Sequence, residues 1–213
     1  MPGLKPGTLT LLLATRNPKK ARELRRLLNG ARSPLAVRIV TLDQFPDLPK
    51  VAEDGATFKA NAIKKSLAVS RRTILPVLAD DSGLEVRALN GRPGVRSARF
   101  SGPRQDDRAN NAKLLKLLKG IPASRRKARF VCWIALAVGG RLIQTFQGTC
   151  AGSIAFQPAG RSGFGYDPLF IPAGCERTMA QLGSSRKDLI SHRARAIARL
   201  RDWLLRAGSK TNP

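Results

Sequence analysis

A short apolar run that leads directly into a capped helix constrains the fold of this chain more than any other feature. Residues Thr8–Ala14 (TLTLLLA) predict a buried strand, because the run is apolar and has the length of a strand. Asn17 and Pro18 follow closely and are typical of a helix N-cap and first turn. The helix predicted there ends at Asn29-Gly30, and its apolar face consists of Leu24, Leu27 and Leu28.

The rest of the chain continues this alternation of strands and helices. Further strands are expected over Leu75–Ala79, Ala128–Val138 and Arg141–Thr149, with Gly139-Gly140 as a hairpin turn between the last two. Further helices are expected over Ala56–Arg72, from Asp106-Asp107 to Gly120, and at the end of the chain, where a face of Ala194, Ile197, Leu200 and Leu204 precedes Gly208. A glycine-rich loop is expected over Ala159–Gly165. This order predicts an α/β fold with a mixed central sheet and flanking helices.

Length and composition fit one folded domain. The chain has 213 residues, of which 42% are hydrophobic, and we expect a single domain over residues 8–208 with tails at 1–7 and 209–213. No apolar run is long enough to span a membrane, and Met1–Gly7 lacks the pattern of a secretory signal. Three cysteines show no zinc-type or redox-type spacing. These features predict a cytoplasmic protein without a membrane anchor.

The formal net charge of +25 is the most unusual property of the composition. A positive field of this size attracts phosphate-bearing molecules, and a nucleic-acid-binding protein would show a similar excess. The basic residues are spread along the chain rather than gathered in one tail, so an adaptation of solubility explains the charge equally well.

Hydrolytic chemistry in this chain would depend on carboxylates, because His192 is the only histidine. Asp80-Asp81-Ser82-Gly83 follows a predicted buried strand, and adjacent carboxylates at a strand terminus point to opposite sides. Together with Glu53-Asp54, this segment has the one or two carboxylates that Mg²⁺ takes alongside phosphate oxygens. An ordinary Asp-Ser-Gly turn would show the same residues.

The segment Thr15–Lys20 between the first strand and the first helix is a candidate anion site. Backbone N–H groups and the positive end of the helix dipole point outward at such a junction, and Lys20 adds a charge one turn into the helix. A capped helix with solvent-facing lysines is the alternative.

Two segments late in the chain are candidates for recognition of a flat ligand. Ser162–Pro168 places Phe164 between two glycines, where the ring can stack on a base, although a core aromatic in a turn would look alike. Lys187, His192 and Arg193 lie near the predicted start of the last helix and offer donors to carbonyl or phosphate oxygens, although a capped basic helix would also carry them.

These four segments occur in an order that closely resembles the inosine/xanthosine triphosphate pyrophosphatase family. The resemblance extends from about Leu11 to about Leu205 and is carried by LLLATRNPKKARELRRLL, EDGATFKANAIKKSLAV, LADDSGLEVRALNGRPGVRSARFSG, ARFVCWIALA, GFGYDPLF and TMAQLGSSRKDLISHRARA. Each motif is modest alone, but the ordered combination is highly specific.

The resemblance implies an elongated, two-lobed α/β domain that holds the nucleotide in a cleft between the lobes, usually in a homodimer. It also implies Mg²⁺-dependent hydrolysis of ITP, dITP or XTP between the α and β phosphates, an activity that cleanses the nucleotide pool. Asp81 would be the catalytic base and, with Glu53, a metal ligand. The substrate would contact Thr15, Arg16, Asn17, Pro18, Lys19, Lys20, Ser82, Phe164, Gly165, Tyr166, Asp167, Lys187, His192 and Arg193.

Two departures from the family pattern affect these expectations. Ala60 stands where many relatives carry a glutamate, so one supporting acid is missing near the metal. Arg16 replaces a frequent glycine and would add charge near the phosphates. Two alternatives remain, a basic nucleic-acid-binding module and an enzyme of the same fold that acts on another modified nucleotide.

Overall fold

The computed structural model describes residues 9–30 and 37–209. The described strands form one six-stranded sheet in the order β2-β1-β3-β4-β5-β6. The strands are β1 (Leu9–Leu13), β2 (Val37–Thr41), β3 (Val77–Val86), β4 (Lys127–Val138), β5 (Arg141–Ile154) and β6 (Phe170–Pro172). The helices are α1 (Pro18–Asn29), α2 (Phe58–Ser70), α3 (Asp107–Leu117), α4 (Met179–Ile190) and α5 (His192–Ser209). Because β1 runs parallel to β2 and β3 while β5 and β6 are antiparallel, the sheet is mixed.

The chain divides into two compact units, and three strands contribute residues to both. Unit 1 contains the chain up to Asp81, Trp133–Gln147 and the chain from Arg195 onward. Unit 2 contains Ser82–Cys132 and Gly148–Ala194. The division falls between Asp81 and Ser82 in the middle of β3.

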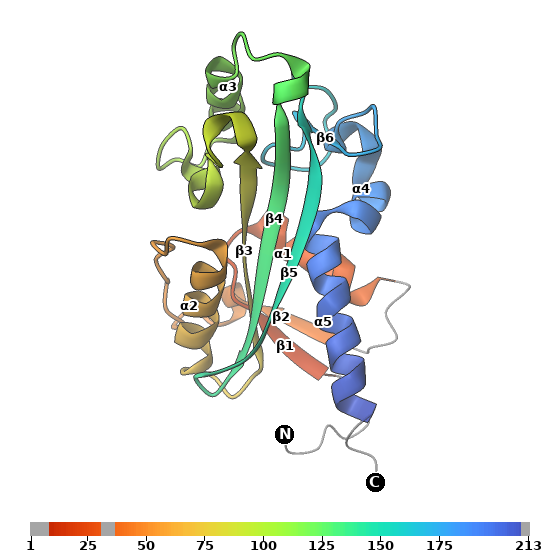
Figure 1. Cartoon of the computed structure of the whole chain (residues 1–213). Helices are drawn as coiled ribbons and strands as arrows, with labels where there is room; N and C mark the ends of the chain where they lie inside the picture. Colours follow the sequence, from red (N-terminus) through yellow and green to blue (C-terminus); the bar gives the residue numbers. More distant parts are fainter. Residues whose placement is uncertain (1–8, 31–36, 210–213) are drawn as a thin grey trace. The chain divides into compact units, whose positions relative to one another are not determined.

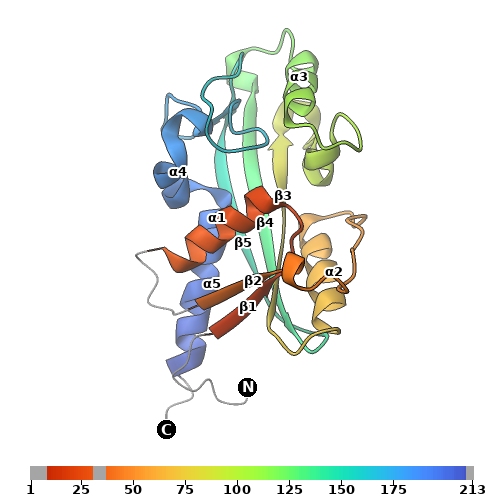
Figure 2. The same ribbon diagram turned by 180° about the vertical axis from the view of Figure 1, so that it is seen from behind.

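Unit 1 is built on the parallel pair β1–β2, which is connected through α1. Leu9 to Leu13 pair in register with Val37 to Thr41. Figures 1 and 2 show α1 and α5 on opposite sides of this strand pair. The hydrophobic core of this unit includes a cluster of buried side chains from the strands and the segments next to them (Leu12, Ala14, Val40, Leu42, Leu48, Val69, Val77, Ala79). Val69 anchors α2 to this core, which also contains residues of β1, β2 and β3.

Unit 2 packs α3 and α4 around a second buried cluster. Its members include Leu84, Leu114, Phe130, Leu169, Phe170 and Met179. Asp106 caps α3, and Thr178 and Gln181 form a capping box at the start of α4. Figure 1 shows α4 beside the short strand β6.

The sequence-based expectation for β3 was wrong in its length. The strand continues from Val77 through the Asp-Asp-Ser-Gly segment to Val86, so the two aspartates lie within the strand rather than at its end. The chain does not turn at Asp-Ser-Gly. Gly83 instead packs closely against Ser97, and a Cβ added to Gly83 would lie 2.3 Å from the Ser97 hydroxyl oxygen. Tertiary packing thus overrides the local turn preference of Asp-Ser-Gly.

Most other predicted elements are confirmed, with shifted ends. The structure also contains β2, β6 and α4, which were not predicted, and β5 extends beyond Thr149 to Ile154. Within the described residues, α5 does not end at Gly208 and continues to Ser209. Thr8, the tail at 1–7 and residues 210–213 lie outside the described part of the chain. Across 9–30 and 37–209, none of the helices has the length and apolar character needed to cross a bilayer.

Candidate functional site

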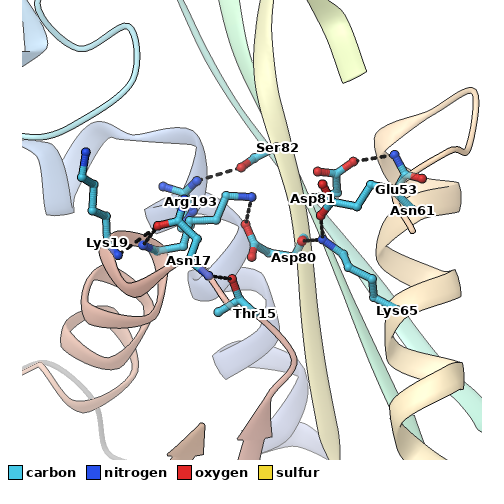
Figure 3. A network of polar contacts seen from close by, with 11 residues as sticks. Thr15, Asn17, Lys19, Glu53, Asn61, Lys65, Asp80, Asp81, Ser82 and Arg193 are labelled. Carbon is cyan, nitrogen blue, oxygen red and sulfur yellow. Dashed lines mark hydrogen bonds and ion pairs between the residues drawn. The ribbon is translucent and has the colours of Figure 1, made fainter. Parts of the chain in front are cut away.

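The segment before α1 is organised by Asn17, which caps the helix. Its side-chain oxygen accepts hydrogen bonds from the backbone N–H groups of Lys19 (2.9 Å) and Lys20 (3.1 Å), and Thr15 Oγ1 accepts from the N–H of Asn17 (3.2 Å). Figure 3 shows this arrangement. The capping oxygen therefore already occupies two of the backbone donors expected to meet an anion. The helix dipole and the lysine side chains remain as the attractive features for phosphate.

Arg16 is engaged in a contact that sequence reasoning did not foresee. Its guanidinium donates to the carbonyl oxygen of Leu48 at 2.9 Å. Leu48 belongs to the buried core of unit 1. Arg16 thus ties the loop before α1 to the connection between β2 and α2, which carries Glu53.

Three carboxylates of unit 1 are arranged around two lysines. Lys20 forms an ion pair with Asp80 (3.3 Å), and Lys65 Nζ contacts both the Glu53 carboxylate and the backbone carbonyl of Asp80. The side-chain amide of Asn61 donates to Asp81 at 2.9 Å. We call Glu53, Asp80, Asp81, Lys20 and Lys65 the carboxylate–lysine cluster, part of which is drawn in Figure 3.

Asn61 and Lys65 were missed by the sequence analysis, although a signal was present. They lie four residues apart on α2 and are buried together with Phe58, Ala62, Ser66 and Val69. An amide and a lysine on the buried face of a helix require polar partners, which predicts a buried polar site beside that face.

The pKa values of the two proposed metal ligands, Asp81 and Glu53, are shifted in opposite directions. Burial raises the pKa of the Asp81 carboxyl, and Lys20 and Lys65 offset that effect only in part. Burial also acts to raise the pKa of Glu53, but Lys65 and Lys20 outweigh it and hold that pKa below its ordinary value. The two carboxyls therefore differ in basicity although they belong to one cluster.

The donor set of this cluster fits a magnesium ion. All its candidate ligands are carboxylate oxygens, which Mg²⁺ prefers, and Glu53 and Asp81 are close enough for the charge of one to affect the pKa of the other. Over the residues that the structure describes, no group of three or more His, Cys, Asp or Glu side chains forms a complete metal cage. Ala60 supplies no acid from the exposed first turn of α2. A cation held here would take its other ligands from water and phosphate.

In unit 2, Asp167 organises the predicted glycine-rich loop. Its buried carboxylate accepts a hydrogen bond from the backbone N–H of Phe164 (2.9 Å) and pairs with Lys187 (2.6 Å). Gly163 has a φ of +82°, and a Cβ at that position would lie 2.1 Å from the Asp167 carboxylate. This position therefore requires glycine on both conformational and steric grounds.

The partly exposed ring of Phe164 has two cations against it. Lys187 Nζ lies 4.6 Å from the ring centroid, and Arg193 Cζ lies 5.5 Å from it. Arg193 also donates to the hydroxyl of Ser82 at 2.7 Å (Figure 3). We call Phe164, Asp167, Lys187 and Arg193 the aromatic–cation cluster. Ser82, Phe164, Asp167, Lys187 and Arg193, all predicted as substrate contacts, are thus linked to one another in the structure.

Three further predicted base contacts support the fold of this unit. Tyr166 is buried and donates to the carbonyl of Ser97 at 2.9 Å, and burial raises the pKa of its phenol. His192 stacks on Phe130 at 4.7 Å between centroids. The carbonyl of Gly165 accepts from Asn111 of α3 at 2.9 Å.

Lys187 lies in the last turn of α4 and not in the last helix, α5. The start of α5 is marked by Ser191, whose side-chain oxygen accepts a hydrogen bond from the backbone N–H of Ala194.

The fold and these motifs match known proteins over nearly the whole chain. The model of the Ham1 family matches residues 11–203. The chain is 49% identical to the dITP/XTP pyrophosphatase of Geobacter sulfurreducens, with 91% of this chain and 96% of the relative covered. It is 48% identical to the dITP/XTP pyrophosphatase of Nocardia farcinica, with 94% and 97% covered.

A solved structure shows the same fold. The Ham1 protein of Staphylococcus aureus superposes with a TM-score of 0.81 at 37% identity, with 93% of this chain and 99% of that chain covered. The mixed α/β fold of this chain is therefore that of a known class of α/β proteins. The chain belongs to the Ham1 family.

Proposed function

We propose that this protein is a Mg²⁺-dependent nucleoside-triphosphate pyrophosphatase that hydrolyses ITP, dITP and XTP to the monophosphate and pyrophosphate. Such an activity removes deaminated purines from the nucleotide pool. The carboxylate–lysine cluster is the observation that carries the proposal, and relatives named dITP/XTP pyrophosphatase at 48–49% identity support it. We also propose a homodimer located in the cytoplasm.

Unit 1 would handle the phosphates and the metal. Glu53 and Asp81 would hold Mg²⁺, which supplies charge neutralisation for the polyphosphate and lowers the pKa of bound water. The segment Thr15–Lys20 would bind phosphate oxygens through its lysines and the helix dipole. Lys65 would hold Glu53 in place through their ion pair. These groups would stabilise negative charge by positioning and electrostatics.

Asp81 would accept the proton of the attacking water. A carboxyl whose pKa is raised by burial is a stronger base than an exposed one, and Asn61 fixes one of its oxygens. The water oxygen would attack the α phosphorus, the bond from that phosphorus to the bridging oxygen would break, and pyrophosphate would leave. The acquired proton would then pass from Asp81 to solvent.

Unit 2 would recognise the base. Phe164 would stack on the purine, and Lys187 and Arg193 would donate to the 6-oxo oxygen. An adenine amino group would leave these buried donors without an acceptor, so ATP would be disfavoured. Gly165, Tyr166, Asp167 and His192 would maintain the shape of this unit around the ring.

A substrate panel tests the proposal directly. We expect pyrophosphate release from ITP, dITP and XTP with Mg²⁺, much slower release from ATP, and loss of activity with EDTA. Equal turnover of ATP and ITP would contradict the proposed base recognition. Tight, strongly salt-dependent binding of nucleic acid without any hydrolysis would favour the alternative that the net charge of +25 suggests.

A further inference from the structure

The connection between α3 and β4 in unit 2 is strongly basic (Figure 1). Residues 113–127 contain six lysine or arginine residues and no acidic residue. Lys116, Lys119, Arg125 and Lys127 of this segment are exposed, and no carboxylate in the described part of the chain pairs with any of them. Their positive charge is therefore open to solvent, where it attracts phosphate groups.

Arg126 belongs to the same segment but is buried, and it joins three parts of unit 2. Its guanidinium donates to the carbonyl oxygen of Leu118 at the end of α3 (3.3 Å) and to that of Ala155 just after β5 (3.1 Å). Its Nε is buried and has no hydrogen-bond partner among the residues that the structure describes. These contacts hold the residues that follow β5 against the basic connection.

Phe156 adds a flat apolar side chain to this basic region. It is 66% exposed, and Arg126 Cζ lies 4.3 Å from the centroid of its ring. The cation fixes the ring on one side, while most of the ring remains accessible to solvent. We call Phe156, Lys116, Lys119, Arg125 and Lys127 the basic–aromatic surface. An exposed aromatic ring among cations suits a strand whose bases stack on the ring while its phosphates meet the cations.

We propose that the basic–aromatic surface binds a single-stranded polynucleotide, an interaction that goes beyond the proposed function and does not depend on it. Phe156 would stack on one base, and the four exposed cations would contact phosphates on either side. The bases of a duplex are already paired and stacked, so a duplex would use the charge alone. A lipid surface would need a ring that inserts into the bilayer, whereas the ring of Phe156 is held against Arg126.

Fluorescence anisotropy with a labelled oligothymidylate of about 15 nucleotides tests the inference on the whole protein. EDTA in the buffer would prevent binding through a metal at the carboxylate–lysine cluster. We expect affinity that falls steeply with added salt and that is higher for the single strand than for a duplex of the same length. No binding, equal or tighter binding of the duplex, or tighter binding of phosphatidylserine vesicles would overturn the inference.

A substitution of the ring separates stacking from charge. Phe156→Leu keeps an exposed apolar side chain but removes the aromatic face, so the affinity for the oligothymidylate should fall about ten-fold. Leu142→Ala shortens another exposed apolar side chain outside this surface and should bind like the unchanged protein. Thermal unfolding would show that both variants are folded. Unchanged affinity in Phe156→Leu would contradict the inference.

Two double variants of equal charge assign the electrostatic part to the surface. Arg125→Gln with Lys127→Gln should make the slope of log affinity against log salt shallower by about 1.4, since each lost phosphate contact contributes roughly 0.7 on a single strand. Arg72→Gln with Arg104→Gln removes the same charge from exposed positions elsewhere and should retain the slope. Equal changes in both double variants would mean that the strand responds to net charge alone, and would overturn the inference.

Discussion

The two polar clusters use the same kinds of residues with opposite charge balance. In unit 1, two lysines lie among three carboxylates, two of which we propose as ligands of a cation. In unit 2, one carboxylate compensates two cations, and these cations lie against an aromatic ring. This difference in charge suits the two clusters to two different ligands. An acidic cluster suits a metal and phosphate chemistry, and a basic aromatic cluster suits recognition of an oxygen-bearing base.

The largest effect should come from Asp81→Asn. An amide cannot accept a proton from water and is a poorer metal ligand, so pyrophosphate release from ITP should fall by about 10²–10⁴-fold. Steady-state kinetics would check this result, with Asp54→Asn as the control, because Asp54 is exposed and pairs with Lys64. Full activity in Asp81→Asn would remove this carboxylate from the mechanism.

The next largest effect concerns the stability of unit 2. Asp167→Ala should destabilise the protein by about 3 kcal/mol, because Lys187 would remain as a buried charge without this carboxylate. Urea unfolding would measure the loss. Arg129→Ala at the more exposed ion pair with Glu85 is the comparison and should change stability far less. Similar losses in both variants would show that burial does not govern the strength of these pairs.

A smaller effect is expected from Gly163→Ala. The residue adopts a φ of +82° and its Cβ would collide with the Asp167 carboxylate, so the change should cost about 1–3 kcal/mol and raise KM for ITP. Gly165→Ala is the matched control, since that glycine has a φ of +62° but a Cβ added there would meet no atom within 4 Å. Equal KM values in the two variants would contradict the proposed role of the collision.

The smallest effects are on stability in the metal-free protein, where Glu53 and Asp81 should act with opposite sign. Folding lowers the pKa of Glu53, so its ionisation stabilises the fold above the ordinary glutamate pKa, and that stabilisation is lost as the pH falls through the lowered value. Folding raises the pKa of Asp81, so its ionisation destabilises the fold as the pH rises from the ordinary aspartate pKa through the raised value.

Thermal unfolding at neutral pH in EDTA measures this contrast. Glu53→Gln should lower Tm and Asp81→Asn should raise it, and both differences should shrink in acid, where the carboxyls are protonated in the folded and unfolded states. Shifts of the same sign would show that folding does not move the pKa values of Glu53 and Asp81 in opposite directions.

Helix-capping residues and apolar helix faces were sufficient to predict the helices that carry them. The Asn17-Pro18 cap and the leucine face of α1 predicted that helix well, as did Asp106 for α3. The continuation of β3 through Asp80 and Asp81 could not be predicted in this way, because it depends on the approach of Ser97 to Gly83. The strand β2 and helix α4 likewise lacked a strong periodic signal of their own.

The candidate residues were easier to name than their roles. Arg16 and Tyr166 were predicted as substrate contacts, and the structure adds contacts within the protein, from Arg16 to the carbonyl of Leu48 and from Tyr166 to the carbonyl of Ser97. These partners are distant in the sequence or belong to the backbone, so residue type alone cannot reveal them. Lys65 shows the reverse case, because its importance follows from its burial on α2 and its contacts with Glu53 and Asp80.

The position of Asp81 next to Ser82 also limits how this protein can change in length. A strand alternates its side chains, so one residue inserted between these two would turn every later side chain of β3 to the other face. The hydroxyl that accepts from Arg193 and the buried Leu84 would then exchange environments with their neighbours. Insertions and deletions should therefore be tolerated at the Gly139-Gly140 turn and rejected in the centre of β3.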